Sequence, residues 1–271
     1  MSLIANIFVF FFGSIVGSFL NVCIYRIPRN ESVVWPRSHC PLCNANIRGY
    51  DNIPFISYLV LLGRCRSCKK PISPRYFTIE FLTALSALWL YRSFGLSFDF
   101  FFYFVFLSGL IIATFVDISH RIIPDEVSIG GIGVGLLLSL ARGLHFPGPS
   151  FNARPFIDSF LGTIVGGGII YLTGFIFDMV YFKLLKKPPV QGETTSMGGG
   201  DVKLLAMIGA FLGWKKALVV FFISPFFGVV IGLINLIVKK DHVIPYGPFL
   251  SLAAVLSIFW ADKILVLFFL R

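Results

Sequence analysis

Long stretches without a charged residue constrain this chain more than any other feature. Five of them approach or exceed the ~20 residues that a membrane-spanning helix needs, namely residues 1–25, 100–116, 159–177, 217–238 and 243–261. Three shorter or charge-flanked apolar segments are expected to form buried or tilted spans, namely residues 77–91, 127–141 and 202–214. The hydrophobic content of 56% is far above that of a soluble domain. We therefore predict an all-α polytopic membrane protein with about eight transmembrane helices.

The distribution of basic residues predicts the orientation. From Arg26 to Arg75 there are nine Lys and Arg but only two acids, Glu31 and Asp51. Basic loops remain in the cytoplasm, so the amino terminus is expected outside. The first apolar stretch lacks the basic start and the cleavage site of a signal peptide, which predicts a retained helix. The net charge of +10 suits anionic lipid headgroups and requires no nucleic-acid partner.

Four cysteines form two CxxC pairs within this basic region. Cys40 and Cys43 are separated from Cys65 and Cys68 by 21 residues, which is close to the spacing of structural four-thiolate zinc sites. Disulfides or a redox CxxC are alternatives, although a reducing cytoplasm disfavours disulfides. Four thiolates leave no open coordination position, so this metal is expected to be structural. Cys23, within the first apolar stretch, is expected to be a packed small side chain.

Composition divides the chain into three parts. Residues 1–25 are expected to form the first transmembrane helix, residues 26–76 a cytoplasmic zinc-ribbon-like insert, and residues 77–271 a transmembrane core. A second polar stretch, residues 186–200, contains two prolines and ends in three glycines. This composition predicts a flexible loop at the membrane surface.

Two acids lie at the boundaries of apolar stretches, where a charge is costly and often functional. Asp117 ends the stretch 100–116, and Asp201 follows three glycines and opens the stretch 202–214. In a folded bundle the two could meet at the cytoplasmic face. Facing carboxylates do not easily both ionise, so one could activate water while the other polarises a carbonyl, as in aspartyl proteolysis. The glycines before Asp201 would let a substrate backbone approach.

Each acid also has a simpler explanation. Asp201 could be a helix N-cap, and Asp117 could be an interfacial acid paired with Arg121. Asp125 follows Pro124 and precedes an apolar segment, so helix capping is its expected role, with support of Asp117 as the alternative. The candidate catalytic residues are therefore Asp117 and Asp201, and the candidate supporting residues are Asp125, Gly198, Gly200 and Lys203.

Together these motifs resemble the type IV prepilin peptidase family of intramembrane aspartyl proteases of the GxGD type. Besides the two CxxC pairs and Asp117, the resemblance rests on five ordered segments: residues 17–28 (GSFLNVCIYRIP), 72–80 (ISPRYFTIE), 123–125 (IPD), 198–205 (GGGDVKLL) and 244–249 (IPYGPF). It covers nearly the whole chain, and the ordered set is far more specific than a GGGD sequence alone.

The resemblance implies that Asp117 and Asp201 are the catalytic pair. It implies a bacterial inner-membrane enzyme that removes the leader of type IV prepilins or type II secretion pseudopilins on the cytoplasmic side. It also implies N-methylation of the new amino terminus with S-adenosylmethionine, although no Gly-rich nucleotide loop identifies the cofactor pocket. A transporter that couples ions through the Asp pair is the alternative, but it gives the cysteines no role.

Overall fold

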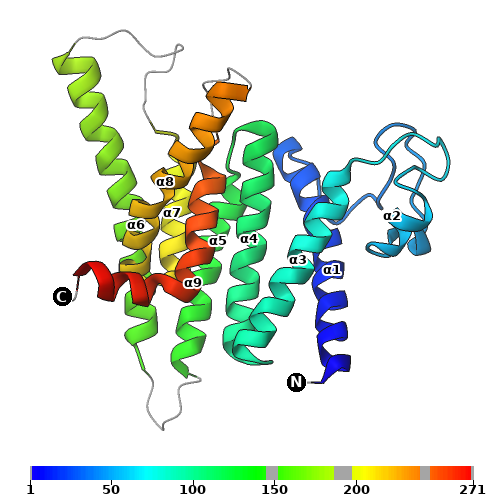
Figure 1. Cartoon of the computed structure of the whole chain (residues 1–271), viewed down its shortest axis with the longest axis horizontal. Helices are drawn as coiled ribbons and strands as arrows, with labels where there is room; N and C mark the ends of the chain where they lie inside the picture. The colour runs from blue at the N-terminus through cyan, green and yellow to red at the C-terminus, as the bar shows by residue number, and fades with distance from the viewer. Residues whose placement is uncertain (1, 145–151, 186–196, 239–244, 270–271) are drawn as a thin grey trace. The chain divides into compact units, whose positions relative to one another are not determined.

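The computed structural model describes residues 2–144, 152–185, 197–238 and 245–269, and its regular structure there is helical (Figure 1). The α-helices are α1 (Leu3–Arg26), α2 (Ile56–Val60), α3 (Pro74–Phe94), α4 (Phe98–His120), α5 (Asp125–Leu144), α6 (Arg154–Asp178), α7 (Gly199–Leu212), α8 (Trp214–Val238) and α9 (Gly247–Phe269). Short 3-10 turns cover Ile27–Arg29 and Gly49–Asn52, and α6 continues as a π-helix over Met179–Leu184. In the described ranges the only β-structure consists of two isolated bridges, both in the cysteine insert.

The predicted apolar segments coincide with helices, and this confirms the all-α membrane class. Five helical stretches are long and apolar enough to cross a membrane, namely Leu3–Arg29, Phe98–His120, Asp125–Leu144, Arg154–Tyr181 and Trp214–Leu233. The predicted count of eight spans is not confirmed, because α3, α7 and α9 do not meet this criterion over their described residues. Part of the predicted loop 186–200, residues 186–196, lies outside the described residues.

One boundary differs from the prediction. The apolar segment 202–214 is not one helix, because α7 ends at Leu212 and α8 begins at Trp214. Gly213 lies between them with a φ of +80°, a conformation that side chains with a Cβ rarely adopt. Its N–H donates to the carbonyl of Gly209 and closes α7.

The chain forms two compact units, Met1–Ile112 and Ala113–Arg271. In the first unit, α1 packs closely against α3 through small residues. A Cβ on Gly13 would lie 2.8 Å from the Cα of Ala84, and one on Gly17 would lie 2.7 Å from the Cα of Glu80. Asn21 also donates from Nδ2 to the carbonyl of Tyr76 at 3.0 Å. Within a membrane, close contacts at glycines and hydrogen bonds between helices of this kind hold neighbouring helices together.

In the second unit, α7 is the central helix and packs against α5, α6, α8 and α9. All eight of its residues from Leu204 to Phe211 are buried. The contact with α6 is the closest, because a Cβ on Gly209 would lie 1.9 Å from the carbonyl oxygen of Gly162. The buried, glycine-mediated packing of α7 fixes the position of its first turn, which carries Asp201.

Candidate functional site

The four predicted cysteines come together in the first unit. The sulfur atoms of Cys40, Cys43, Cys65 and Cys68 all lie within 4.8 Å of one another, and the Sγ atoms of Cys43 and Cys65 are 4.0 Å apart. A tetrahedral zinc site has Zn–S bonds of about 2.3 Å, which places its sulfur atoms slightly under 4 Å apart. The donor set and its spacing therefore fit a structural zinc ion.

The two CxxC turns have the same backbone geometry. In the first turn, the N–H of Asn44 donates to the carbonyl of Cys40, and the N–H of Cys40 donates to that of Ala45. The second turn repeats both bonds at the equivalent positions, where Lys69 pairs with Cys65 and Cys65 with Lys70. The residues after the second cysteines, Asn44 and Lys69, both have positive φ, 56° and 57°. Each turn is also flanked by an isolated bridge, so the backbone itself directs two sulfur atoms from each turn to one point.

The thiols of the cluster compete for ionisation. Backbone N–H groups of Cys68 and Ser67 lower the pKa of the Cys65 thiol to about 7. At Cys43 the N–H of Ala45 favours the thiolate, but burial and the neighbouring thiols outweigh it and raise the pKa to about 11. Adjacent thiolates repel one another, whereas a divalent cation would stabilise all four.

In the second unit, Asp117 lies in the last turn of α4 with a buried side chain, 6% exposed. Its Oδ2 accepts a hydrogen bond of 2.9 Å from the backbone N–H of Gly247, the first residue of α9. A Cβ on Gly247 would lie 2.7 Å from this same oxygen, so only glycine permits the contact. Asp117 is thus held at the amino-terminal end of α9, where helices attract negative charge.

Asp201 lies in the first turn of α7, and it is close enough to Asp117 for the two charges to interact. The alternative that Asp201 is a helix N-cap is wrong, because Gly198 occupies the cap position and no side chain caps the helix. An N-cap at Asp201 would start the helix at Val202, but α7 begins three residues earlier, because Gly199 and Gly200 adopt helical geometry. The structure therefore brings the two predicted acids into one site.

The three glycines before Asp201 have different surroundings. A Cβ on Gly200 would lie 3.1 Å from the Cβ of Ile123, and one on Gly198 would lie 3.4 Å from Oδ2 of Asp201. A Cβ on Gly199 would meet no described atom within 4 Å. Gly200 thus allows close packing of α7 against the loop between α4 and α5, and of the three glycines only Gly199 has no described neighbour.

Gly247 and its neighbour Tyr246 belong to the site without having been predicted individually as site residues. The Tyr246 hydroxyl makes a 2.6 Å hydrogen bond with Oγ of Ser224, a buried residue of α8, and it interacts electrostatically with Asp201. Both residues belong to the segment 244–249, one of the segments on which the family resemblance rests. Residue 244 lies outside the described residues. Spacing could not identify its partner, because Gly247 lies 130 residues from Asp117.

Asp125 and Lys203, both predicted supporting residues, form an ion pair. Nζ of Lys203 lies 2.6 Å from Oδ1 of Asp125, and the side chains are 39% and 58% exposed. Asp125 is the first residue of α5, so this pair connects the first turns of α5 and α7. Asp125 therefore joins α5 to α7 through this ion pair. Asp125 also stands at the start of α5, where a negative charge is favourable.

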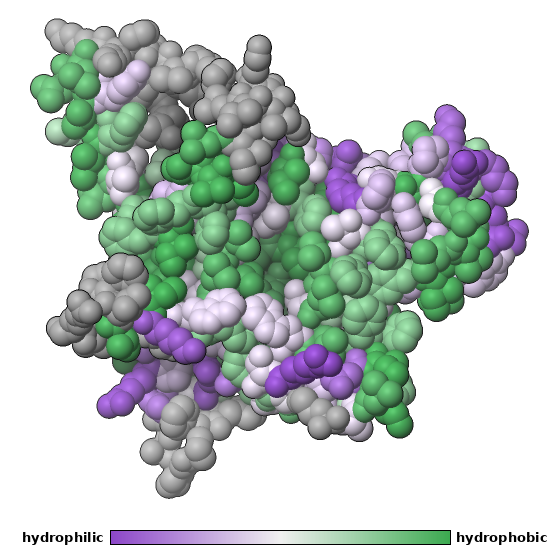
Figure 2. Space-filling model, in the orientation of Figure 1, coloured by the Kyte–Doolittle hydropathy of each residue, from purple (hydrophilic) through white to green (hydrophobic). Residues whose placement is uncertain are grey.

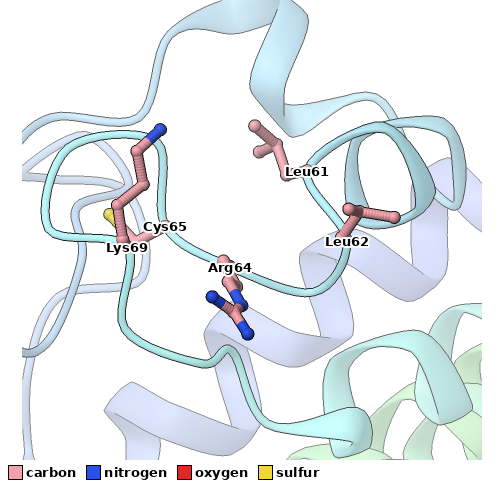
Figure 3. A pocket seen from close by; sticks show the side chains of 5 residues that line it. All are labelled: Leu61, Leu62, Arg64, Cys65 and Lys69. Atoms are coloured by element: carbon pink, nitrogen blue, oxygen red, sulfur yellow. The ribbon is translucent and has the colours of Figure 1, made fainter.

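The first unit also contains a pocket of about 430 Å³ beside the second CxxC turn (Figure 3). It is lined by two leucines, two cations and one cysteine of the cluster, namely Leu61, Leu62, Arg64, Cys65 and Lys69. In Figure 3, Leu61 and Lys69 project from one side of the loop and Arg64 from the other.

Comparisons with known proteins match both parts of the chain. Residues 11–94 match the family model of the "Bacterial Peptidase A24 N-terminal domain", and residues 104–233 match that of the "Type IV leader peptidase family". A protein of Legionella pneumophila named "Prepilin leader peptidase/N-methyltransferase" is 31% identical, over 94% of this chain and 91% of its own length. Proteins of the same name from Aeromonas hydrophila and Pseudomonas aeruginosa are each 30% identical, over 94% and 93% of this chain and 91% and 89% of their own lengths. No solved structure matches. With five apolar helices of membrane-spanning length and relatives of this kind over nearly its whole length, the chain is a multi-pass membrane protein that belongs to the type IV leader peptidase family.

Proposed function

We propose that this protein is an aspartyl endopeptidase of the bacterial inner membrane that removes the leader of type IV prepilins or type II secretion pseudopilins. The observation that carries the proposal is the shared site of Asp117 and Asp201, two acids 84 positions apart that lie within electrostatic reach of each other. The relatives are named for prepilin leader cleavage. Family membership gives no support to the alternative of an ion-coupled transporter.

The chemistry follows from two carboxylates with different roles. The ionised carboxylate takes a proton from water, whose oxygen attacks the scissile carbonyl, while the protonated carboxylate donates a hydrogen bond to the carbonyl oxygen. The proton is then returned to the leaving amine as the peptide bond breaks. Gly247 holds Asp117 in place through its N–H. Gly198 and Gly200 fix the start of α7, and Lys203 with Asp125 joins α7 to α5.

The second proposed activity is N-methylation of the amino terminus that cleavage exposes, as in the relatives' names. S-adenosylmethionine would supply the methyl group to the neutral amine. The described residues contain no strand and therefore no strand–loop–helix nucleotide site. We assign no residues to the cofactor and derive no step through it.

Residues 26–76 are proposed as a zinc-binding insert on the cytoplasmic side, and residues 77–271 as the peptidase core that follows it. The zinc ion would be held by Cys40, Cys43, Cys65 and Cys68, and it would stabilise the fold of the insert without taking part in hydrolysis. The basic composition of the insert supports an amino terminus on the side of the membrane that faces away from the cytoplasm. The partners are thus prepilin-like substrates and the lipid bilayer, with no nucleic acid.

The test is incubation of the purified protein with a prepilin and S-adenosylmethionine, followed by mass measurement of the product. We expect a product shortened by the leader and heavier by one methyl group. Cleavage without methylation would remove the second activity from the proposal. An unchanged prepilin, in the presence of folded enzyme, would contradict the first.

The acids are tested with Asp117→Asn and Asp201→Asn, because an amide keeps the shape of the side chain and removes its ionisation. Each substitution should abolish cleavage while leaving folded protein in the membrane. Since the two acids act as one unit, the double variant should be scarcely worse than either single variant. Cleavage near the normal rate by either single variant would refute the assignment.

A further inference from the structure

An apolar segment, residues 53–62, separates the two CxxC turns of the otherwise polar insert. It contains no charged residue, and it includes the five-residue helix α2. Its large side chains face outward, since Leu59 is 62% exposed, Val60 69% and Leu62 85%. In Figure 2 a hydrophobic patch covers the part of the insert where Figure 1 places α2. Exposed apolar patches of this kind usually mark a surface that another phase or molecule covers.

The segment lies beside the membrane-spanning part of α1. The ring of Phe55 stacks on that of Phe10 with centroids 5.5 Å apart, and it also contacts Phe77 and Phe81 of α3 at 5.4 and 6.3 Å. The depth of the Phe55 backbone follows from Glu80 of α3, which accepts its N–H and whose Cα would lie 2.7 Å from a Cβ on Gly17 of α1. Gly17 lies about 14 Å along the axis of α1 from Arg26, at 1.5 Å per residue. Because the hydrocarbon core is about 30 Å thick, Phe55 lies in its cytoplasmic half and not in bulk cytoplasm.

The backbone of the segment is suited to an environment with little water. The N–H of Phe55 donates to Oε2 of Glu80 on α3 at 3.1 Å. Backbone N–H groups that follow it donate to carbonyls within the segment, namely those of Ile56, Ser57, Leu59, Leu61 and Leu62. An unsatisfied N–H is costly in lipid, so this internal pairing removes the main obstacle to insertion.

Charged groups resume at both ends of the segment. Before it, Asp51 forms an ion pair with Arg66 at 2.7 Å. After it, Arg64 and Lys69 line the pocket that Leu61 and Leu62 also line (Figure 3). This order of leucines followed by cations matches the boundary between acyl chains and anionic headgroups, where long basic side chains reach the phosphates.

We propose that residues 53–62 insert into the cytoplasmic leaflet and anchor the cysteine insert to the lipid bilayer. The occupant of the patch is therefore lipid, because the segment stacks through Phe55 on Phe10 of α1, a helix whose Phe8, Phe11 and Ile15 are exposed apolar side chains suited to acyl chains. The insert is then held at the membrane surface by two helices and by its own apolar segment. This surface lies outside the site of Asp117 and Asp201 and does not depend on their function.

The test uses the full chain, loaded with zinc, in nanodiscs of phosphatidylethanolamine and phosphatidylglycerol. Leu59 and Val60 are replaced, one at a time, by the photoreactive amino acid p-benzoylphenylalanine. Leu42 in the first CxxC turn receives the same change as a control, because it is also an exposed apolar residue of the insert, 58% exposed. All three positions are exposed, so a larger ring should be accommodated, and one zinc per chain verifies the fold of each variant. Irradiation is followed by mass spectrometry of the adducts.

The expected result is a phospholipid adduct at Leu59 and Val60 and none above background at Leu42, because an inserted apolar face lies within the headgroup and acyl boundary. Yields equal to the control would overturn the proposal. So would adducts to a second copy of this chain, or to a prepilin added to the nanodiscs, since the patch would then be a protein-binding surface.

Discussion

Replacement of Gly247 by alanine should damage catalysis much more than stability. The added Cβ would lie 2.7 Å from Oδ2 of Asp117 and 3.4 Å from Cδ1 of Ile123. Both atoms are the ends of side chains, which can move without displacing a helix. Alanine is also the better helix former, by about 0.5–1 kcal/mol. The thermal unfolding temperature should therefore change little, whereas the Asp117 carboxylate must leave its present position.

The size of the catalytic loss follows from the displacement of the Asp117 carboxylate. The Gly247 N–H holds its Oδ2 at 2.9 Å, and a Cβ at 2.7 Å from this oxygen would push it out of that position. A reacting group misplaced by about 1 Å can lose roughly 100-fold in rate, so we expect kcat/KM to fall roughly 10- to 100-fold.

The assay is cleavage of a purified prepilin, with the unfolding temperature measured on the same samples. The matched control is Gly133→Ala in α5, where an added Cβ would meet no described atom within 4 Å. Gly133→Ala should cleave normally. The reasoning is refuted if Gly247→Ala stays within about twofold of the natural enzyme, or if both variants lose activity equally.

Three further predictions concern packing, metal and charge. Gly209→Ala would place a Cβ 1.9 Å from the backbone oxygen of Gly162. It should lower the free energy of unfolding by about 1–3 kcal/mol or more, whereas Gly168→Ala on the open face of α6 should not, as thermal unfolding will show. Cys65→Ser should lose the stoichiometric zinc that elemental analysis finds in protein purified under reducing conditions, and a mild chelator that spares the fold should leave cleavage largely intact. Asp125→Asn breaks an exposed ion pair and should cost under about 1 kcal/mol of stability, with substantial cleavage retained; complete loss would indicate a direct chemical role.

The sequence was sufficient for the helices and for the cysteine cluster, and the reason is that both signals are local. A long uncharged stretch has few alternatives to a membrane helix, and two CxxC turns can each form from six consecutive residues. The position of Asp201 was harder to predict. A residue that follows three glycines looks like a helix N-cap, yet the helix begins at Gly199 and the cap is Gly198.

Contacts between distant segments could not be predicted from spacing. The bond between Asp117 and Gly247 joins α4 to α9, and no periodicity links these helices. The apolar segment 53–62 was hidden for another reason. It is too short for a membrane span and lies within a region of basic, soluble-like composition, so its length and surroundings both pointed to the cytoplasm. Its stacking on Phe10 of α1 is a contact between distant segments, which composition does not predict.

The glycines before Asp201 serve different needs, although the motif presents them as one unit. Gly200 must lack a Cβ because Ile123 would otherwise be 3.1 Å away, and this contact holds the loop between α4 and α5 against the first turn of α7. Asp117 lies just before that loop and Asp201 lies in that turn, so the packing of Gly200 bears directly on the approach of the two acids. Gly199 has no such neighbour among the described residues. The hypothesis that a glycine lets a substrate backbone approach therefore applies to Gly199. At Gly200, the contact with Ile123 is a sufficient reason for glycine.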